Sequence, residues 1–540
     1  MAPLTKVLFI GIDAGDRFLL QSWAADGTLK NFRSLLAGGL TGDTLSLDGF
    51  FEGATWPSFY TGVSPARHGF HRLVQLRPGT YELYPSLPGE SVKREPFWNS
   101  LSRAGKRVAI LDVPLSSISG SINGIQTVEW GSHDAAYGFQ AWPPELKQEV
   151  HCKFGPHPMR DACDLFGQDQ RLSALRDLLV EGVKRKAMLT NHFLKKGGWD
   201  FLAQVFTESH CIGHQCFHLH DPGHPGYDPK TAAAAGDLMR DVYIALDSAV
   251  GDILEHVSPE TVVVLLASHR MSHNFGAQFL LSDILIGLKV AERFLSRAEA
   301  GRLEATRERL SLVLGWCWRH MPRSAKERLL PFRNRARSGL VDNRIPPPFS
   351  IHGIDPRKSM CFPLDNGLSV GGIRLNVTGR EPDGIVEPGE EVDALCRDLS
   401  LDLLAIIECD SGLPIVKSVK KTAELYQGEY LSHLPDLLVE WNDAIRIGSA
   451  GTANPRGSKL VLASDRMGRI EGTNAYCRTG DHRREGLFVA IGPGITRGHL
   501  ERTVSIMDFA PTFADLLGVG LDDAEGEPIS EISMAARPLT

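Results

Sequence analysis

The chain has 540 residues and a formal net charge of −7, from 58 Lys and Arg against 65 Asp and Glu. This length can form one large α/β domain with insertions or several smaller domains. The slight acidic excess argues against a protein that binds nucleic acid over its whole surface, although it leaves room for a local basic patch. We therefore do not expect nucleic acid as a partner.

Cysteine usage and hydropathy bear on the compartment. The nine cysteines form an odd set without a CxxC pair, which is typical of reduced thiols in the cytoplasm. Residues 1–6 lead us to expect no secretory signal. The longest apolar stretch, residues 261–267, is far shorter than the ~20 residues of a membrane-spanning helix. We expect a cytoplasmic protein with no transmembrane segment.

Short apolar runs alternate with helical patterns, which indicates an α/β fold with a mostly parallel sheet. We expect a three-layer α/β/α sandwich with helices on both faces of the sheet. The expected strands are residues 7–12, 107–111, 201–206, 262–267, 436–440 and 487–491. The expected helices cover residues 92–104, 169–195, 231–256, 388–407 and 507–517. Most of the notable polar residues follow strand ends, where open α/β sheets gather their ligands.

Residues 291–360 differ in character from the rest of the chain. They are rich in Arg and Leu, contain Trp316 and Trp318, and include the helix-breaking run Pro346–Pro348. We expect a helical, basic insertion or cap between two parts of one catalytic core, residues 1–290 and 361–540. A basic amphipathic helix can also bind a membrane surface or an acidic partner. We favour a cap with a solvated basic face.

The run Gly53-Ala54-Thr55-Trp56-Pro57-Ser58-Phe59-Tyr60-Thr61-Gly62 is the most informative stretch. It predicts a helix that starts one residue after Thr55, with Pro57 in its first turn. An oxygen nucleophile would then lie at the positive end of the helix dipole, where backbone N–H groups can hold a phosphate or sulfate. A threonine hydroxyl is a poor nucleophile unless its proton is removed. A metal ion is the expected agent, because the His and Asp residues are spaced to hold one or two.

Several residues are candidate metal ligands. Asp13 directly follows the first expected strand and could either bind a cation or cap the next helix, a role that we expect for Asp16. His210 and His214 are four residues apart, so on a helical turn both imidazoles point the same way, as in known zinc sites. Three further histidines, in what reads as a Pro/Gly loop, are expected at the surface: His218, His220 and His224.

The Thr55 run, with the following Ser64-Pro65-Ala66-Arg67-His68-Gly69, resembles the nucleophile segment of the alkaline phosphatase superfamily. It is most similar to the type I phosphodiesterase/nucleotide pyrophosphatase branch. The segments Ala267–Met271, Thr479–Gly486 and Ser505–Thr512 are similar to further stretches of that family, in the same order. In the last of these, Asp508 is expected to start a helix rather than to take part in catalysis.

The resemblance implies an alkaline phosphatase-like fold and two divalent metal ions, expected to be zinc. One site would consist of His210, His214 and His482, and the other of Asp13, Thr55 and His269. Ser268 and His210 stand where the family usually has Asp, so both sites carry less negative charge and the second is expected to be the weaker. Asp481 would orient His482 or bind metal itself, and Arg270, in a position usually held by Gly, would project into the crevice.

The resemblance also implies the activity: hydrolysis of phosphate esters, with phosphodiesters favoured, through a phospho-threonine intermediate on Thr55. A phosphomonoesterase would need an extra cation, for which Arg72, Arg270 and Arg483 are candidates, although structural ion pairs are favoured for each. A sulfatase is disfavoured, because Thr55 cannot yield formylglycine and Phe59 stands where that motif has Arg. A catalytically impaired protein that binds a phosphorylated ligand is the remaining alternative. The expected partner is a small-molecule phosphoester, and the oligomeric state stays open.

Overall fold

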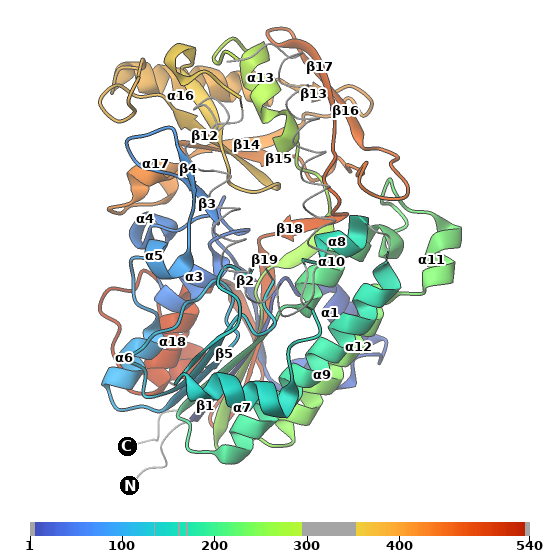
Figure 1. The fold of residues 1–540 in the computed structure, drawn as a ribbon, viewed down its shortest axis with the longest axis vertical. Helices are drawn as coiled ribbons and strands as arrows, with labels where there is room; N and C mark the ends of the chain where they lie inside the picture. The colour runs from blue at the N-terminus through green and yellow to red at the C-terminus, as the bar shows by residue number, and fades with distance from the viewer. Residues whose placement is uncertain (1–5, 134, 160–161, 169–170, 294–352, 535–540) are drawn as a thin grey trace.

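The computed structural model describes residues 6–133, 135–159, 162–168, 171–293 and 353–534. Its centre is a nine-stranded sheet with the order β20-β2-β19-β9-β1-β8-β5-β6-β7 (Figure 1). Most neighbouring strands in it are parallel, and β19 and β7 run antiparallel to their neighbours, which confirms the expected fold class. The strands are β1 (Lys6–Ile12), β2 (Leu40–Leu45), β5 (Val108–Leu111), β6 (Gly124–Val128), β7 (Gln140–Trp142), β8 (Phe201–Phe206), β9 (Thr261–Ala267), β19 (Glu485–Ile491) and β20 (Gly498–Ser505).

Helices cover both faces of this sheet because the side chains of its central strand alternate between two cores. Leu8, Ile10 and Ile12 of β1 belong to one core, and Val7 and Phe9 belong to the other. On the first face lie α1 (Arg17–Ala25), α2 (Lys30–Gly38), α9 (Leu172–Lys196), α10 (Glu208–His220) and α12 (Leu238–Leu254). On the second face lie α3 (Thr55–Thr61), α6 (Phe97–Arg103) and α18 (Phe509–Leu516).

The register of the central strands places their carboxyl ends side by side. Ile12, the last residue of β1, lies opposite Phe206 of β8 and Ala267 of β9, which are also the last residues of their strands. The residues that follow therefore leave the sheet at the same edge. This edge carries the candidate site.

Two expected helices differ from the observed ones for local reasons. The expected helix at 231–256 is two helices, α11 (Pro229–Ala235) and α12. Gly236, with φ of 74°, ends α11, and the Asp237 carboxylate accepts the Arg240 N–H at the start of α12. The helix expected from residue 92 begins only at Phe97, after the extended Pro96. As expected, Asp16 caps α1 and Asp508 completes a capping box with Ser505.

A second group of strands forms its own sheets and core (Figure 1). A four-stranded sheet has the order β11 (Cys361–Leu364), β12 (Val370–Leu375), β15 (Leu437–Trp441) and β14 (Val416–Lys421). Beside it lie β13 (Ile407–Glu408), β16 (Lys459–Ser464), β17 (Gly468–Thr473), α13 (Leu281–Gly287) and α16 (Glu390–Leu404). The strand expected at 436–440 thus belongs to this antiparallel sheet rather than to the central one. Residues 294–352, most of the expected insertion, lie outside the described residues.

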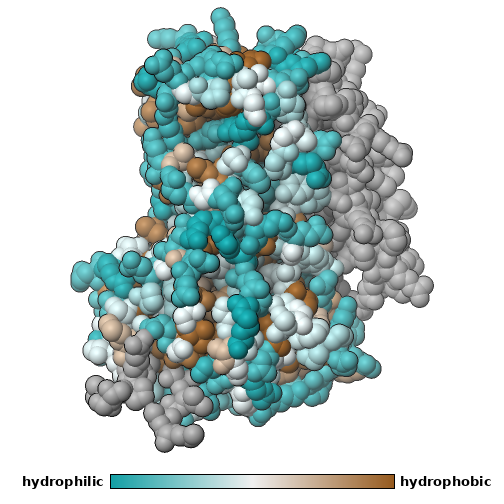
Figure 2. All heavy atoms as spheres, turned by 90° about the vertical axis from the view of Figure 1, so that its left-hand side faces the viewer, coloured by the Kyte–Doolittle hydropathy of each residue, from teal (hydrophilic) through white to brown (hydrophobic). Residues whose placement is uncertain are grey.

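The surface supplies two further observations. Hydrophilic side chains cover most of the face shown in Figure 2, and apolar residues on it form small separate patches. In the described part of the chain, no helix is long and apolar enough to cross a membrane.

Candidate active site

Thr55 is the first residue of α3, with Ala54 as its N-cap, so the helix begins one residue earlier than the sequence indicated. Its side chain is buried and donates a hydrogen bond to the Phe51 carbonyl oxygen at 2.6 Å. The Ser46 Oγ lies 2.5 Å from the Thr55 Oγ1. Because the single hydroxyl proton of Thr55 goes to Phe51, Ser46 must be the donor in this contact. Ser46 follows the carboxyl end of β2 and was not among the expected site residues.

Asp13 connects helix α3 to the histidines. Its Oδ1 accepts a hydrogen bond from Trp56 Nε1, and its Oδ2 accepts one from His210 Nδ1, both at 2.7 Å. Burial raises the pKa of the Asp13 carboxyl, but the neighbouring His210 and these hydrogen bonds outweigh burial and hold the pKa well below its usual range. Asp13 is therefore an ionised carboxylate whose two oxygens both have protein partners.

His210 and His214 lie on the first turns of α10 with their Nε2 atoms 2.9 Å apart. Each Nδ1 faces an acceptor, since His210 Nδ1 meets the Asp13 carboxylate and His214 Nδ1 meets the Gly480 carbonyl at 2.8 Å. Each Nδ1 must therefore carry a proton, and a neutral imidazole then has its lone pair on Nε2. Two lone pairs at this distance repel each other unless a proton or a metal ion lies between them.

His269 and His482 complete the cluster. His482 lies on β18 (Gly480–Arg483), which pairs with β10 (Arg270–His273) directly after His269. The His482 ring centroid is 4.7 Å from those of His210, His214 and His269. The structure thus brings Asp13, His210, His214, His269 and His482 together at one edge of the sheet.

Two buried ring nitrogens in this cluster are free to bind a cation. His269 Nε2 and His482 Nδ1 have no hydrogen-bond partner among the described residues. Burial lowers the pKa of His269 to about 4 and that of His214 and His482 well below the usual value, so all three are neutral at neutral pH. Neutral imidazoles with unused lone pairs are the donors that zinc prefers.

The side chains of this cluster can hold one cation, bound by imidazoles, more readily than they can hold a second cation. His210, His214 and His482 offer three nitrogens, whereas both oxygens of Asp13 and the Thr55 hydroxyl already have partners. Ser268, in place of a carboxylate, lies with its Oγ 3.0 Å from His269 Nδ1 and so orients that ring.

Arg478 introduces a positive charge that the sequence did not indicate. Its guanidinium pairs with both carboxylate oxygens of Asp164, at 2.8 and 3.1 Å, and its Nη1 lies 3.1 Å from His214 Nε2. The pKa of Arg478 is raised well above its usual value because Tyr476 and Asp164 outweigh the effect of burial. The guanidinium competes with a cation for the same nitrogen.

The arginines proposed as an extra cation have other partners. Arg270 pairs with Glu485 at 3.2 Å and stacks over Phe18, so it lies against α1. The other two follow the favoured structural alternative, since Arg72 pairs with Glu52 at 3.2 Å and Arg483 stacks over Phe275.

Asp481 bonds to the backbone of His482, and two of the later histidines differ from expectation. The Asp481 carboxylate accepts the backbone N–H of His482 at 2.8 Å, and burial raises its pKa to about 7. The expected surface position of His218 and His224 is wrong, because both are buried. Helix α10 continues to His220, which directs His218 toward Thr479 Oγ1 at 3.1 Å.

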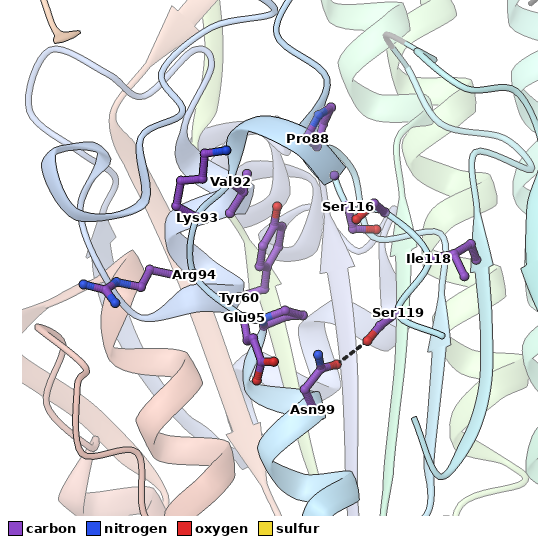
Figure 3. A pocket seen from close by; sticks show the side chains of 13 residues that line it. Tyr60, Pro88, Val92, Lys93, Arg94, Glu95, Asn99, Ser116, Ile118 and Ser119 are labelled. Carbon is purple, nitrogen blue, oxygen red and sulfur yellow. Dashed lines mark hydrogen bonds between the residues drawn. The ribbon is translucent and has the colours of Figure 1, made fainter. Parts of the chain in front are cut away.

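A separate cavity of about 270 Å³ lies at the Tyr60 end of α3 (Figure 3). It is lined by residues that include Tyr60, Lys93 and Ser116, and Ser119 donates a hydrogen bond to Asn99 at 2.7 Å beside it. None of the candidate site residues lines this cavity.

Comparison with known proteins gives a family and a fold. A family model described as type I phosphodiesterase/nucleotide pyrophosphatase matches residues 7–296, more than half of the chain. No curated protein matches significantly. The structure of the alkaline phosphatase PafA aligns with a TM-score of 0.51 and 14% identity over 98% of this chain and 99% of that one. Phosphonoacetate hydrolase from Sinorhizobium meliloti 1021 aligns with a TM-score of 0.50 and 14% identity over 94% of each chain. These likenesses support the alkaline phosphatase-like fold.

Proposed function

The chain belongs to the type I phosphodiesterase/nucleotide pyrophosphatase family and is a phosphoric ester hydrolase, and from this premise we propose that it hydrolyses small-molecule phosphodiesters through a phospho-threonine intermediate on Thr55. The observation that carries the proposal is the position of Thr55 at the start of α3, in a hydrogen-bonded chain of hydroxyls beside the cluster of Asp13 and the histidines.

The reaction would proceed in two displacements. The Thr55 hydroxyl loses its proton to solvent, its oxygen attacks phosphorus, and a P–O bond to Thr55 forms. The bond to the leaving alkoxide breaks, and the alkoxide takes up a proton from solvent to become the alcohol. A water molecule then attacks the phospho-threonine, and the P–O bond to Thr55 breaks, which restores the hydroxyl. Ser46 would donate a hydrogen bond to the Thr55 oxygen throughout and thereby stabilise its negative charge.

We propose that His210, His214 and His482 hold one divalent cation, and that Asp13, Thr55 and His269 hold a second, weaker one. Zinc is the proposed metal, because the first donor set is three imidazoles. When bound, such a cation would lower the pKa of the Thr55 hydroxyl and offset charge on the phosphoryl oxygens. Asp13 would fix the tautomer and orientation of His210 through its 2.7 Å hydrogen bond.

The partners of the arginines support a diester rather than a monoester substrate. A monoester carries a second negative charge that would call for another cation. Arg72, Arg270 and Arg483 are engaged with Glu52, Glu485 and Phe275, and the charge of Arg478 beside His214 is paired with Asp164. The free thiols in the described part support the cytoplasm as the proposed compartment.

The test compares hydrolysis of bis(4-nitrophenyl) phosphate and 4-nitrophenyl phosphate by the full chain, with zinc and after chelation. We expect chelator-sensitive turnover that favours the diester and is lost in Thr55→Ala. Thr61→Ala is the matched control, because Thr61 lies on the same helix and its hydroxyl bonds only to backbone groups, the Pro57 carbonyl and the Val63 N–H. Mass spectrometry of quenched enzyme should find phosphate on Thr55. Full turnover by Thr55→Ala would refute the nucleophile assignment.

A phospho-ligand-binding protein without turnover is the second candidate, favoured by Ser268 and His210 in place of carboxylates. It predicts zinc-dependent binding of a phosphodiester with no release of 4-nitrophenol.

A further inference from the structure

A second group of metal-ligating side chains lies beside the histidine cluster. It consists of His133, in the loop after β6, Cys163, just before α8 (Asp164–Gln168), and Cys211, on α10. Their ligand atoms all lie within 4.8 Å of one another. Both cysteines are buried, and Cys211 directly follows His210 in the chain.

The spacing matches a tetrahedral zinc site. Zn–S bonds of ~2.3 Å and Zn–N bonds of ~2.0 Å at a tetrahedral angle place nitrogen and sulfur about 3.5 Å apart. His133 Nδ1 is 3.2 Å from Cys211 Sγ and 3.7 Å from Cys163 Sγ. Ordinary packing does not require that one nitrogen face two sulfurs at this spacing.

His133 fits this group better than it fits the histidine cluster, although its ring also lies near His210 and His214. The rings of His133 and His210 are stacked, with centroids 4.1 Å apart and an interplanar angle of 30°. Lone pairs of imidazole nitrogens lie in the ring plane, so stacked rings cannot direct two of them at one ion. The His210 ring stands instead at 81° to His482, which allows their lone pairs to converge.

The surroundings also suit a thiolate. Gln215, one turn after Cys211 on α10, holds its Nε2 2.8 Å from Asp164 Oδ1 and 3.7 Å from Cys163 Sγ, and the two hydrogens of the amide allow it to donate to both. Such N–H donors to sulfur are typical of the residues around bound metal. Two thiolates and one imidazole favour zinc or another soft cation over magnesium or calcium.

We propose that His133, Cys163 and Cys211 hold a zinc ion distinct from the cations of the histidine cluster. This ion would join the loop after β6, the start of α8 and α10. Through the stacked His133 ring it would hold His210 in position without touching substrate.

The test uses Co²⁺ as the probe on the full chain, purified under reducing conditions and stripped of metal. The donors of the histidine cluster are nitrogen and oxygen, so a thiolate-to-cobalt charge-transfer band in the near ultraviolet reports only the proposed site. We expect this band in the wild-type protein and its loss in Cys163→Ser and Cys211→Ser. Zinc analysis should show one equivalent less per chain in these variants.

Matched controls are Cys216→Ser, a buried cysteine on the same helix, and Cys152→Ser, an exposed one; both should keep the band. Gln215→Leu should keep the band but weaken the affinity about 10- to 100-fold. If the serine variants fail to fold, the wild-type protein supplies the test instead. Bound zinc should then protect Cys163 and Cys211 from an alkylating reagent.

Absence of the band together with unprotected thiols, or a disulfide between Cys163 and Cys211 in the isolated protein, would overturn the proposal. Neither result depends on turnover, so failure of the phosphodiesterase assay would leave this test intact.

Discussion

The Nε2 atoms of His210 and His214 face each other at 2.9 Å, and each ring is fixed in this orientation by an acceptor at its Nδ1. An acceptor-only partner at each Nδ1 leaves no neutral arrangement in which one Nε2 donates to the other. The two Nε2 atoms are consequently positioned to bind one cation between them. Binding of that cation should have a measurable effect on the stability of the protein.

We expect zinc to raise the melting temperature of the metal-stripped protein. A ligand at 100 times its Kd stabilises the folded state by about 2.7 kcal/mol. In His214→Ala this gain should fall, because one of three nitrogens is lost. Calorimetric scans with and without zinc measure the effect, and His151→Ala, at an exposed position of α7 (Glu145–Phe154), is the control. An undiminished zinc effect in His214→Ala would contradict this assignment.

Ser46→Ala tests the hydroxyl chain at Thr55. The variant removes the proton that Ser46 donates to the Thr55 Oγ1. Hydrogen bonds to charged groups contribute about 1.5–3 kcal/mol, so kcat on a phosphodiester should fall about 10- to 100-fold while KM changes little. Ser58 lies on the same helix as Thr55, but its hydroxyl faces His68, so Ser58→Ala should keep kcat near normal. A change confined to KM would place Ser46 in substrate binding instead.

Strand ends made part of the site predictable. Asp13 and His269 follow β1 and β9, and parallel strands of matched register bring such residues to one edge. The spacing of His210 and His214 indicated a shared helix face. The shift of Thr55 into the first helical position is within the usual uncertainty of helix boundaries.

Other features depend on tertiary packing that no local pattern records. Arg478 and His133 reach the site from loops whose paths are set by distant contacts, such as the Arg478–Asp164 pair. Arg270 follows His269 directly but turns toward Asp16 and Glu485. The burial of His218 and His224 depends on how far α10 extends, and nothing in the Pro/Gly-rich sequence after it fixes that length.

Stability should rise with pH on the acidic side because of buried histidines away from the candidate metal ligands. Burial lowers the pKa of His68 to about 3, and the Phe70 N–H donates to His68 Nδ1 at 3.2 Å, a contact that protonation would break. Between this value and the usual 6.5 the unfolded chain binds the proton and the folded one does not. The free energy of unfolding therefore increases by about 1.4 kcal/mol per pH unit for this residue as the pH rises from 3 toward 6.5.

Chemical unfolding of metal-free protein at several pH values checks this slope. His68→Gln should show a shallower slope, whereas His256→Gln, at an exposed position, should match the wild type. An unchanged slope in His68→Gln would show that His68 takes up its proton in the folded state as readily as in the unfolded one.

Arg478→Gln should strengthen zinc binding. The wild-type guanidinium lies 3.1 Å from His214 Nε2, so it repels a cation and occupies a lone pair that the cation needs. A charge at such a distance changes the interaction energy by up to about 4 kcal/mol near a protein surface, and we expect a gain in affinity of about tenfold or more. The double variant Arg478→Gln/Asp164→Asn removes both charges of the pair. Its gain in zinc affinity should be smaller, since the Asp164 carboxylate no longer attracts the cation. Zinc titrations against a competing chelator measure all three proteins. Weaker binding in the single variant would mean that Arg478 positions His214 more than it repels the metal.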